Sequence, residues 1–205
     1  MTQIKFITKS EKIYLANNEH LIVFDILLEG EKVERNIKIN LDGEGASVEV
    51  YGIFFGNQNQ RFISSHTVNH NASRTSSYLL TKGVLDDKAV CAYRSLIDIQ
   101  PGATGCKGEQ KEDTMILSRE AHIDAVPALQ IGNDDVKASH SVSATYLDEV
   151  KKFYLEARGL SESEAESMAV FSHLADILDK IEDKSLKEKI VKKINVKVGE
   201  RPGRQ

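Results

Sequence analysis

The chain has 205 residues, enough for one substantial domain or for one domain with an appendage. Its net charge of -4 argues against a nucleic-acid partner, and no apolar run approaches the roughly 18 residues of a membrane span. Two cysteines do not make a disulfide framework, and the first residues lack the basic-then-apolar pattern of a secretion signal, so we expect a cytoplasmic protein with no membrane partner.

The first 145 residues have the pattern of short strands separated by turns. An apolar run at 21–28, interrupted by Asp25, is typical of a buried strand, and residues 36–51 alternate polar and apolar on either side of a turn at 42–45. Further short apolar segments lie at 89–93, 96–99, 114–117, 128–131 and 136–138. Such a series fits a sandwich, a barrel or a solenoid. Because the turns at Pro101, Ser118 and Asn133 are unevenly spaced, the pattern alone favours the commoner sandwich.

Residues 146–198 have the pattern of a helical subdomain, and 199–205 that of a flexible tail. A first helix is expected to end at Gly159, and Ser161 followed by Glu164 predicts a capping box at the start of a second. The second helix carries an apolar stripe, which fits either internal packing or the docking of a partner. A third, lysine-rich amphipathic helix is expected over 186–194.

Four blocks, within 45–77, 82–103, 117–140 and 147–162, together resemble the SufB/SufD family of iron–sulfur cluster assembly scaffold proteins. The second begins Lys-Gly-Val-Leu-Asp-Asp-Lys-Ala, and the third ends Asn-Asp-Asp-Val-Lys-Ala-Ser-His. The resemblance is closer to SufD, or to short archaeal members, than to SufB. It runs from about residue 45 to about residue 178, and the first 44 residues match nothing recognised, so they are either extra coils or a capping sheet.

The resemblance implies a mainly β fold, a right-handed parallel β-helix over 1–145 with a C-terminal helical tail. It also implies a non-catalytic scaffold subunit of a SUF-type complex. Family members pair through their β-helices, so the expected partner is a second copy or a SufB-like paralogue. Their C-terminal helices dock onto an ABC-type ATPase, SufC. The residues of this chain expected to bind that partner are Phe153, Tyr154, Arg158, Met168, Phe171 and Leu174.

The same resemblance makes His140 and Glu112 the candidate metal ligands. His140 matches a histidine that SufD-type proteins contribute to a nascent cluster between subunits, and imidazole is a competent ligand for iron. The alternative is a half-buried histidine bonded to a backbone carbonyl. Glu112 stands where SufB proteins carry a cysteine, and Ser141 where they carry a glutamate. The expected cofactor is therefore a transient iron–sulfur cluster or a ferrous ion at a subunit interface, which this chain alone is poorly equipped to hold.

Other candidate side chains have simpler interpretations. Cys106 is expected in a flexible loop and Cys91 in the core. His66 and His70 lie four residues apart, which we take not to place both on one face, so they are expected to be solvated or hydrogen-bonded.

Two alternatives to the leading hypothesis stay open. One is a degenerate SufBD-like interaction module that binds no cluster, as the substitutions at the ligand positions indicate. The other is a β-helical enzyme acting on polysaccharide through paired carboxylates. The absence of tryptophan and the 6% aromatic content disfavour the second alternative.

Overall fold

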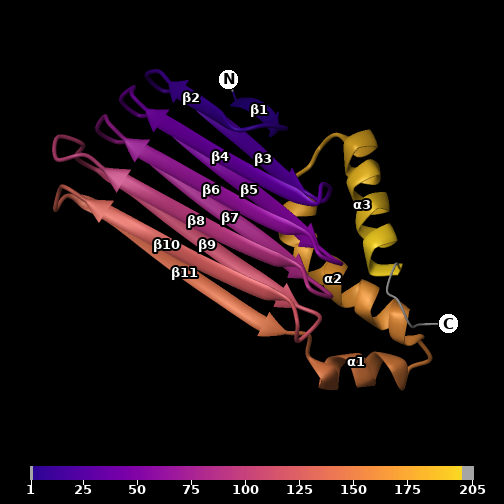
Figure 1. Ribbon diagram of the computed structural model, residues 1–205. Helices are drawn as coiled ribbons and strands as arrows, with labels where there is room; N and C mark the ends of the chain where they lie inside the picture. The colour runs from indigo at the N-terminus through magenta and orange to yellow at the C-terminus, as the bar shows by residue number, and fades with distance from the viewer. Residues whose placement is uncertain (1, 200–205) are drawn as a thin grey trace.

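The computed structural model describes residues 2–199, within which the chain forms eleven strands and three helices. Successive strands alternate between two sheets, so that the chain winds as a solenoid (Figure 1). Sheet A contains, in spatial order, β1 (Thr2–Ile7), β3 (His20–Leu27), β5 (Ser47–Gly56), β7 (Ser76–Leu85), β9 (Cys106–Ile116) and β11 (Val136–Tyr146). Sheet B contains β10 (His122–Ile131), β8 (Val90–Ile99), β6 (Arg61–His70), β4 (Lys32–Leu41) and β2 (Glu11–Leu15). Each strand pairs in parallel with its neighbours, which confirms the predicted parallel solenoid and excludes the sandwich.

The turns of successive coils stack on one another. At one corner Asn18, Gly45, Arg74 and Gly105 all adopt positive φ, and the N–H of each donates to a carbonyl of the next coil. These positions are 27, 29 and 31 residues apart (18 to 45, 45 to 74, 74 to 105), which is the length of one coil. Only two of the four are glycine, so the stacked hydrogen bonds help to hold a conformation that other residues adopt reluctantly.

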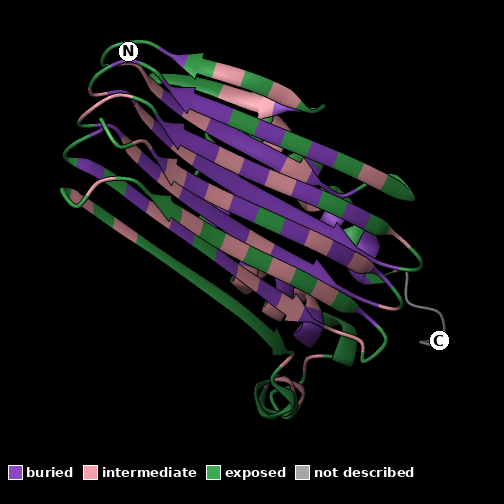
Figure 2. Cartoon of the chain, turned by 60° about the vertical axis from the view of Figure 1, so that its left-hand side comes forward, coloured by how far each residue is buried: buried purple, intermediate pink, exposed green. Residues whose placement is uncertain are grey.

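Burial alternates along many of the strands, as the banding in Figure 2 shows. This follows because successive side chains of a strand point alternately into the solenoid and out of it. The interior has two apolar regions. One includes Val23, Val50 and Leu79, and the other includes Phe54 and Phe62. A layer of polar side chains lies in register between these regions, and it is described below.

The helices α2 (Glu162–Leu178) and α3 (Lys184–Gly199) cover the outer face of sheet A, while α1 (Glu149–Glu156) follows the last strand (Figure 1). Val170 and Ile177 of α2 and Ile190 of α3 pack against outward side chains of the sheet, among them Phe24 and Ile53. No helix among the described residues is long and apolar enough to cross a membrane.

Local signals fix where the helices begin and dock. The Asp148 side chain accepts from two N–H groups of the first turn of α1, and the predicted capping box of Ser161 and Glu164 is present at α2. Nε2 of His173, in α2, lies 3.1 Å from the carbonyl oxygens of both Gly83 and Asp113, to which it donates. Because burial lowers the pKa of His173, the ring joins α2 to β7 and β9 in its neutral form.

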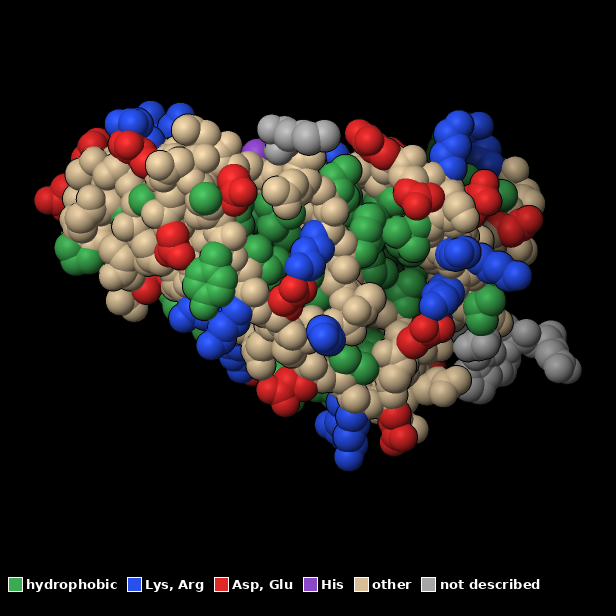
Figure 3. Space-filling model, turned by 90° about the horizontal axis from the view of Figure 1, so that it is seen from above, with side chains coloured by type: hydrophobic (Ala, Val, Ile, Leu, Met, Phe, Trp, Pro, Cys, Tyr) green, Lys and Arg blue, Asp and Glu red, His purple; other side chains and the backbone are tan. Residues whose placement is uncertain are grey.

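The two ends of the solenoid differ in polarity. At the N-terminal end the inward-facing Lys5 and Glu11 form an ion pair across the interior, which gives the first coil a charged cap. Seen from above, in Figure 3, hydrophobic side chains gather in a hollow at this end. A groove of about 370 Å³ lies there between β1, β3 and α3, lined in part by Phe6, Phe24, Ile26, Leu186 and Ile190. The last coil at the C-terminal end has no comparable charged pair among its inward residues.

The structure assigns secondary structure to the segments that the sequence left undecided. The first 44 residues form β1 to β4, which are further coils of the same solenoid. The last strand ends at Tyr146 and α1 begins at Glu149. Gly199, expected to begin the flexible tail, is the last residue of α3, and residues 200–205 lie outside the described part of the chain.

Candidate functional site at the open end of the solenoid

Strand β11 is the outermost strand of sheet A and pairs only with β9. Its other edge therefore presents unpaired backbone N–H and C=O groups, a ready template for another strand. From Ser139 to Tyr146 every residue of β11 is exposed, and this stretch of the strand is green in Figure 2. This edge is long, with eleven residues, and its only charged side chain is Lys137 apart from the titratable His140.

The inward-facing side chains of the last coil are mostly small and apolar. On β11 they include Ala138, Val142 and Ala144, and on β10 they include Ile123 and Leu129, as the register with the preceding coil shows. In the other coils such residues are covered by the next coil, but here Val142 is 43% exposed. Because each coil of a solenoid depends on its neighbour for burial, the inward apolar side chains of the last coil are left without a cover at this end.

His140 lies within this apolar row. It pairs in register with Gln110 of β9, which is buried and faces inward, so the imidazole of His140 belongs to the inward row at the open end. It is exposed to solvent. The alternative of a half-buried histidine does not fit, and the ring is accessible to a ligand or to a second subunit.

Glu112 lies one strand deeper and two residues further along. It faces inward from β9 and is 3% exposed. Its Oε1 accepts from the Thr114 hydroxyl, while its Oε2 is buried without a partner among the described residues. Burial raises the pKa of Glu112 to about 7, an effect that the Thr114 hydrogen bond opposes and nearby Asp113 reinforces.

The two candidate ligands are near neighbours but do not complete a metal site. Strand spacing and rise place the Cα atoms of His140 and Glu112 about 8 Å apart. Within residues 2–199, no three or more His, Cys, Asp or Glu side chains are grouped so as to hold a metal ion. Further ligands would have to come from water, from other residue types or from a second subunit.

The residues predicted to bind the ATPase divide into two groups. Helix α1 contains no buried residue, and Phe153 is 70% exposed beside Tyr154. The guanidinium of Arg158 lies 5.0 Å from the centre of the Tyr154 ring. This aromatic surface is held next to α2 by Lys152, whose Nζ bonds Glu162 Oε1 at 2.5 Å.

On α2 the predicted stripe serves mainly to attach the helix. Leu174 is completely buried against sheet A, so its side chain offers no surface to a partner, contrary to the prediction. Phe171 is partly buried and packs against the same cluster. Met168 is half exposed and remains accessible. The candidate docking surface is therefore Phe153, Tyr154, Arg158 and Met168, to which Phe171 contributes only an edge.

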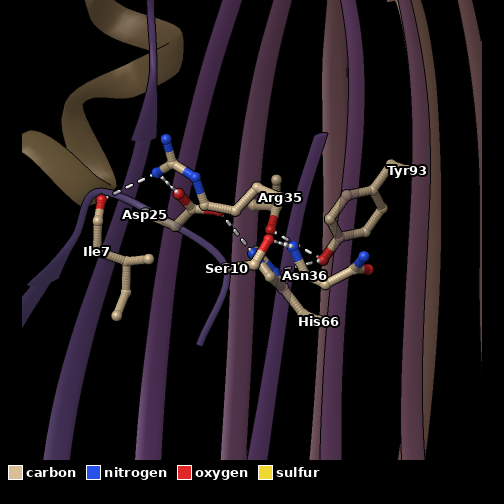
Figure 4. Close-up of polar contacts among 8 residues, drawn as sticks. Ile7, Ser10, Asp25, Arg35, Asn36, His66 and Tyr93 are labelled. Atoms are coloured by element: carbon tan, nitrogen blue, oxygen red, sulfur yellow. Dashed lines mark hydrogen bonds and ion pairs between the residues drawn. The ribbon is translucent and has the colours of Figure 1, made fainter. Parts of the chain in front are cut away.

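A buried polar layer inside the solenoid, shown in Figure 4, was not foreseen from the sequence. Arg35 Nη1 donates to Asp25 Oδ1 at 2.6 Å, and His66 Nε2 lies 3.0 Å from Asp25 Oδ2. The other ring nitrogen of His66 lies 3.2 Å from the Tyr93 hydroxyl, which lies 3.0 Å from the Thr81 hydroxyl. Asp25 accepts from Arg35 Nη1 and from His66 Nε2, and His66 Nδ1 accepts from the Tyr93 hydroxyl, so every group in the row has a partner.

A glycine makes room for this layer. Gly52 stands between Asp25 and Thr81 in the register of sheet A. A Cβ at Gly52 would lie 2.8 Å from Thr81 Oγ1 and 3.3 Å from His66 Cε1. The absence of a side chain at this position lets the His66 ring cross the interior from sheet B.

The hydrogen bonding expected for His66 and His70 is confirmed, but the expectation that they do not share a face was wrong, as was the flexible loop expected around Cys106. His66 and His70 both face inward from β6, because residues four apart in a strand lie on the same face. Both are buried and hydrogen-bonded, and burial lowers the pKa of His70 to about 4. Cys106 is not in a flexible loop: it is buried at the start of β9, 3.2 Å from the Thr75 hydroxyl. Cys91 lies in the core as expected.

These features define a parallel β-solenoid with a charged cap at one end, an open apolar edge at the other and an exposed aromatic helix beside it. The family model described as "SUF system FeS cluster assembly, SufBD core domain" matches residues 4–173. The chain belongs to this family. The match begins far earlier than residue 45, so the first coils are part of the core and not an unrelated addition.

Curated relatives agree with this assignment. The chain is 25% identical over 188 residues to the iron-sulfur cluster assembly protein SufD of Escherichia coli, covering 88% of this chain and 44% of that protein. It is 28% identical over 173 residues to SufD of Bacillus subtilis, covering 84% and 39%. A SufBD family protein of Staphylococcus saprophyticus is 31% identical over 134 residues, covering 65% and 29%. The chain thus spans less than half the length of these relatives, and it is SufD-like.

Proposed function

We propose that the chain is a non-catalytic scaffold subunit of a SUF-type iron–sulfur cluster assembly complex. In this role it pairs through the open end of its solenoid and docks a SufC-like ABC ATPase through its C-terminal helices. The observation that carries the proposal is the polarity difference between the two ends of the solenoid. Both ends of sheet A finish in an edge strand with one unpaired side, β1 and β11. At the N-terminal end a charged pair, Lys5 and Glu11, covers the interior, while at the C-terminal end the inward row beneath the edge is mostly apolar.

The open end favours a partner of the same construction. A second β-solenoid, either another copy or a SufB-like paralogue, brings its own unpaired edge strand and its own apolar row. Such pairing continues sheet A across the interface and covers side chains such as Val142 and Ala144. His140 then lies at the junction of the two subunits, where the partner adds ligands that this chain lacks. A transient iron–sulfur cluster or a ferrous ion is the cargo expected there.

The exposed face of α1 supports the second contact. Phe153 and Tyr154 form an apolar surface beside the cation of Arg158, and α1 lacks any buried residue that would explain them by internal packing. Exposed aromatic and arginine side chains are the residue types that dominate protein interfaces. The proposed occupant of this surface is the ATPase subunit.

Co-purification with the SufC-like ATPase from the same source tests this proposal. Phe153→Asp is preferred to a substitution at Phe171, because Phe171 also packs against sheet A and its replacement would disturb the fold. Tyr14→Asp is the matched control, since Tyr14 is 65% exposed on the remote sheet B. A stable complex with wild type and with Tyr14→Asp, abolished by Phe153→Asp, is the expected result. Failure of the wild-type chain to bind the ATPase under any nucleotide condition would refute the proposed role as a subunit of a SUF-type complex.

A second candidate, an interaction module that binds no cluster, is favoured by one observation. The described residues do not provide a group of three or more His, Cys, Asp or Glu side chains that could hold a metal ion. The resemblance also implies that Glu112 stands where SufB proteins carry a cysteine. Anaerobic reconstitution with iron and sulfide separates the two hypotheses, with wild type and His140→Ala compared both alone and with the paralogue. Iron and sulfide retention that depends on His140 supports the scaffold. Equal and negligible retention in both supports the module.

A further inference from the structure

A hollow of about 540 Å³ lies between α3 and two stacked turns of the solenoid. The turn between β3 and β4 forms one wall with residues 28–30, and the turn between β5 and β6 forms the next with Asn57, Gln58 and Gln60. The third wall is the C-terminal half of α3, which runs past the ends of these strands (Figure 1). The volume is that of a small-molecule site, and the proposed function does not use this hollow.

Positive charge outweighs negative charge around this hollow. Its charged lining residues are Glu29 and the lysines Lys189, Lys192, Lys193 and Lys197. The carboxylate of Glu29 pairs with Lys193, whose Nζ lies 2.7 Å from Oε2. Lys189 and Lys192 are exposed, and neither forms an ion pair with a carboxylate of the described residues. In a chain with a net charge of -4, this is a local concentration of cations.

The lysines form a row because of the helix geometry. Lys189, Lys193 and Lys197 follow one another at intervals of four residues, so they lie on one face of α3 in a row about 12 Å long. Like charges at this spacing repel one another and destabilise a helix. The helix dipole favours Lys197, which lies in the last turn of α3, but its effect does not extend back to Lys189. Helix stability therefore does not explain the row.

Lys197 is held in place at the end of this row. The residue is 8% exposed, and its Nζ donates to Asn57 Oδ1 and to Gln60 Oε1, both at 2.6 Å. Gln60 is itself held, because its Nε2 donates to the carbonyl oxygen of Gly30 at 2.8 Å. The ammonium group of Lys197 is thus positioned before any ligand arrives, which lowers the entropic cost of binding.

The shape and charge of the hollow select a ligand class. Lysine ammonium groups bind phosphate oxygens as point charges, and a row of them matches consecutive phosphate groups better than it matches a single phosphate. We propose that this hollow binds a soluble molecule that carries a linear phosphate chain, through Lys189, Lys192 and Lys197. Leu28 and Val196 line the same hollow and offer apolar contacts to an uncharged part of that molecule. The inference goes beyond the scaffold role and does not depend on it.

Isothermal titration calorimetry of the full chain with tripolyphosphate, at low ionic strength and without divalent metal ions, tests the site. One tripolyphosphate is expected to bind per chain, more tightly than inorganic phosphate. Lys189→Gln and Lys192→Gln are each expected to weaken binding roughly tenfold, because each removes one charge-assisted contact. Added salt is expected to weaken binding as well, because it screens exposed charges. Both side chains are exposed, so the variants keep the fold, which circular dichroism verifies.

Lys38→Gln is the matched control. Lys38 is exposed on sheet B and pairs in register with the exposed Lys12, so it also belongs to a group of neighbouring lysines, but on the sheet that α3 does not cover. Unchanged tripolyphosphate affinity in Lys38→Gln supports the site. The inference is overturned if wild type binds no stoichiometric tripolyphosphate, if inorganic phosphate binds as tightly, or if Lys38→Gln weakens binding as much as Lys189→Gln does.

Parallel titrations with adenosine triphosphate and with phosphatidylglycerol vesicles separate a soluble phosphate chain from a lipid headgroup as the source of the phosphate. Binding of adenosine triphosphate that Lys189→Gln weakens supports the soluble ligand. Binding to the vesicles alone, without binding of tripolyphosphate or adenosine triphosphate, overturns it.

Discussion

Replacing Asp25 with alanine removes the centre of the buried polar layer. The carboxylate partners both Arg35, whose side chain is 10% exposed, and His66, whose side chain is 2% exposed. Asp25→Ala leaves the guanidinium in the interior with the carbonyl oxygen of Ile7 as its remaining acceptor among the described residues. Breaking a buried pair by deleting one member destabilises a protein by about 3–5 kcal/mol, because the remaining charge is uncompensated.

For a domain of this size, that loss corresponds to a decrease in Tm of roughly 6–20 °C. Urea unfolding followed by circular dichroism measures it. Asp42→Ala is the matched control: Asp42 is an exposed turn residue whose carboxylate accepts from Asn71. The expected change for Asp42→Ala is within about 0.5 kcal/mol.

A second substitution tests the stated cause. If the penalty comes from the orphaned charge, Arg35→Met added to Asp25→Leu removes that charge and restores most of the lost stability. A loss below about 1 kcal/mol for Asp25→Ala would refute the reasoning. The reasoning would also be refuted if the Asp25→Leu, Arg35→Met double variant lost more stability than the sum of the losses caused by the two single substitutions.

Three further perturbations follow from the structure. Since the folded-state pKa of Glu112 is raised to about 7, the stabilisation by its protonated form is fully present at pH 4 and is lost as pH rises through 7. Glu112→Gln removes this pH dependence. At pH 8 it is expected to raise the free energy of unfolding by up to roughly 3 kcal/mol, and Tm with it. Lys197→Ala breaks two 2.6 Å hydrogen bonds that hold α3 to the turn after β5, and speeds amide exchange in α3, whereas the exposed Lys192→Ala does not. Gly52→Ala forces its Cβ against the polar layer and lowers stability by about 1–3 kcal/mol, whereas Gly102→Ala meets nothing within 4 Å and leaves Tm unchanged; equal effects would contradict the packing argument.

The strand-rich character of the first 145 residues could be predicted from the sequence, but the strand bounds and the coil repeat could not. Alternation correctly marked part of β4 and the start of β5. The segments predicted at 89–93 and 96–99 are one strand, β8, the segment at 114–117 covers only the end of β9, and no individual segment was predicted for β1, β2, β6 or β7. The uneven spacing arose because each coil has two turns, and Ser118 lies at a different corner from Pro101 and Asn133. At comparable corners the positive-φ residues include Asn18 and Arg74 as well as glycines, so the turns carry no repeated residue signature. Family resemblance was needed to choose the solenoid.

The buried polar layer could not be predicted from the sequence, for a different reason. Asp25, Arg35 and His66 come from three strands of two sheets, and only the register of the coils brings them together. That His66 and His70 lie on the same face could, in contrast, have been predicted from the sequence, since positions four apart in a strand share a face. The stripe on α2 was correctly seen as ambiguous. Leu174 is buried because sheet A has an apolar outer face, which sequence alternation does not reveal when both faces of a strand are covered.

Hydrogen exchange along β11 tests the central claim most directly, that the open end of the solenoid is where this subunit meets another. Amide exchange is measured by residue for the chain at low concentration, at high concentration and with the SufB-like paralogue. The account predicts that the amides of β11 become protected on association, and that Val142→Lys prevents this protection while the fold persists. Association that leaves β11 exchanging freely, and that Val142→Lys does not weaken, would contradict it.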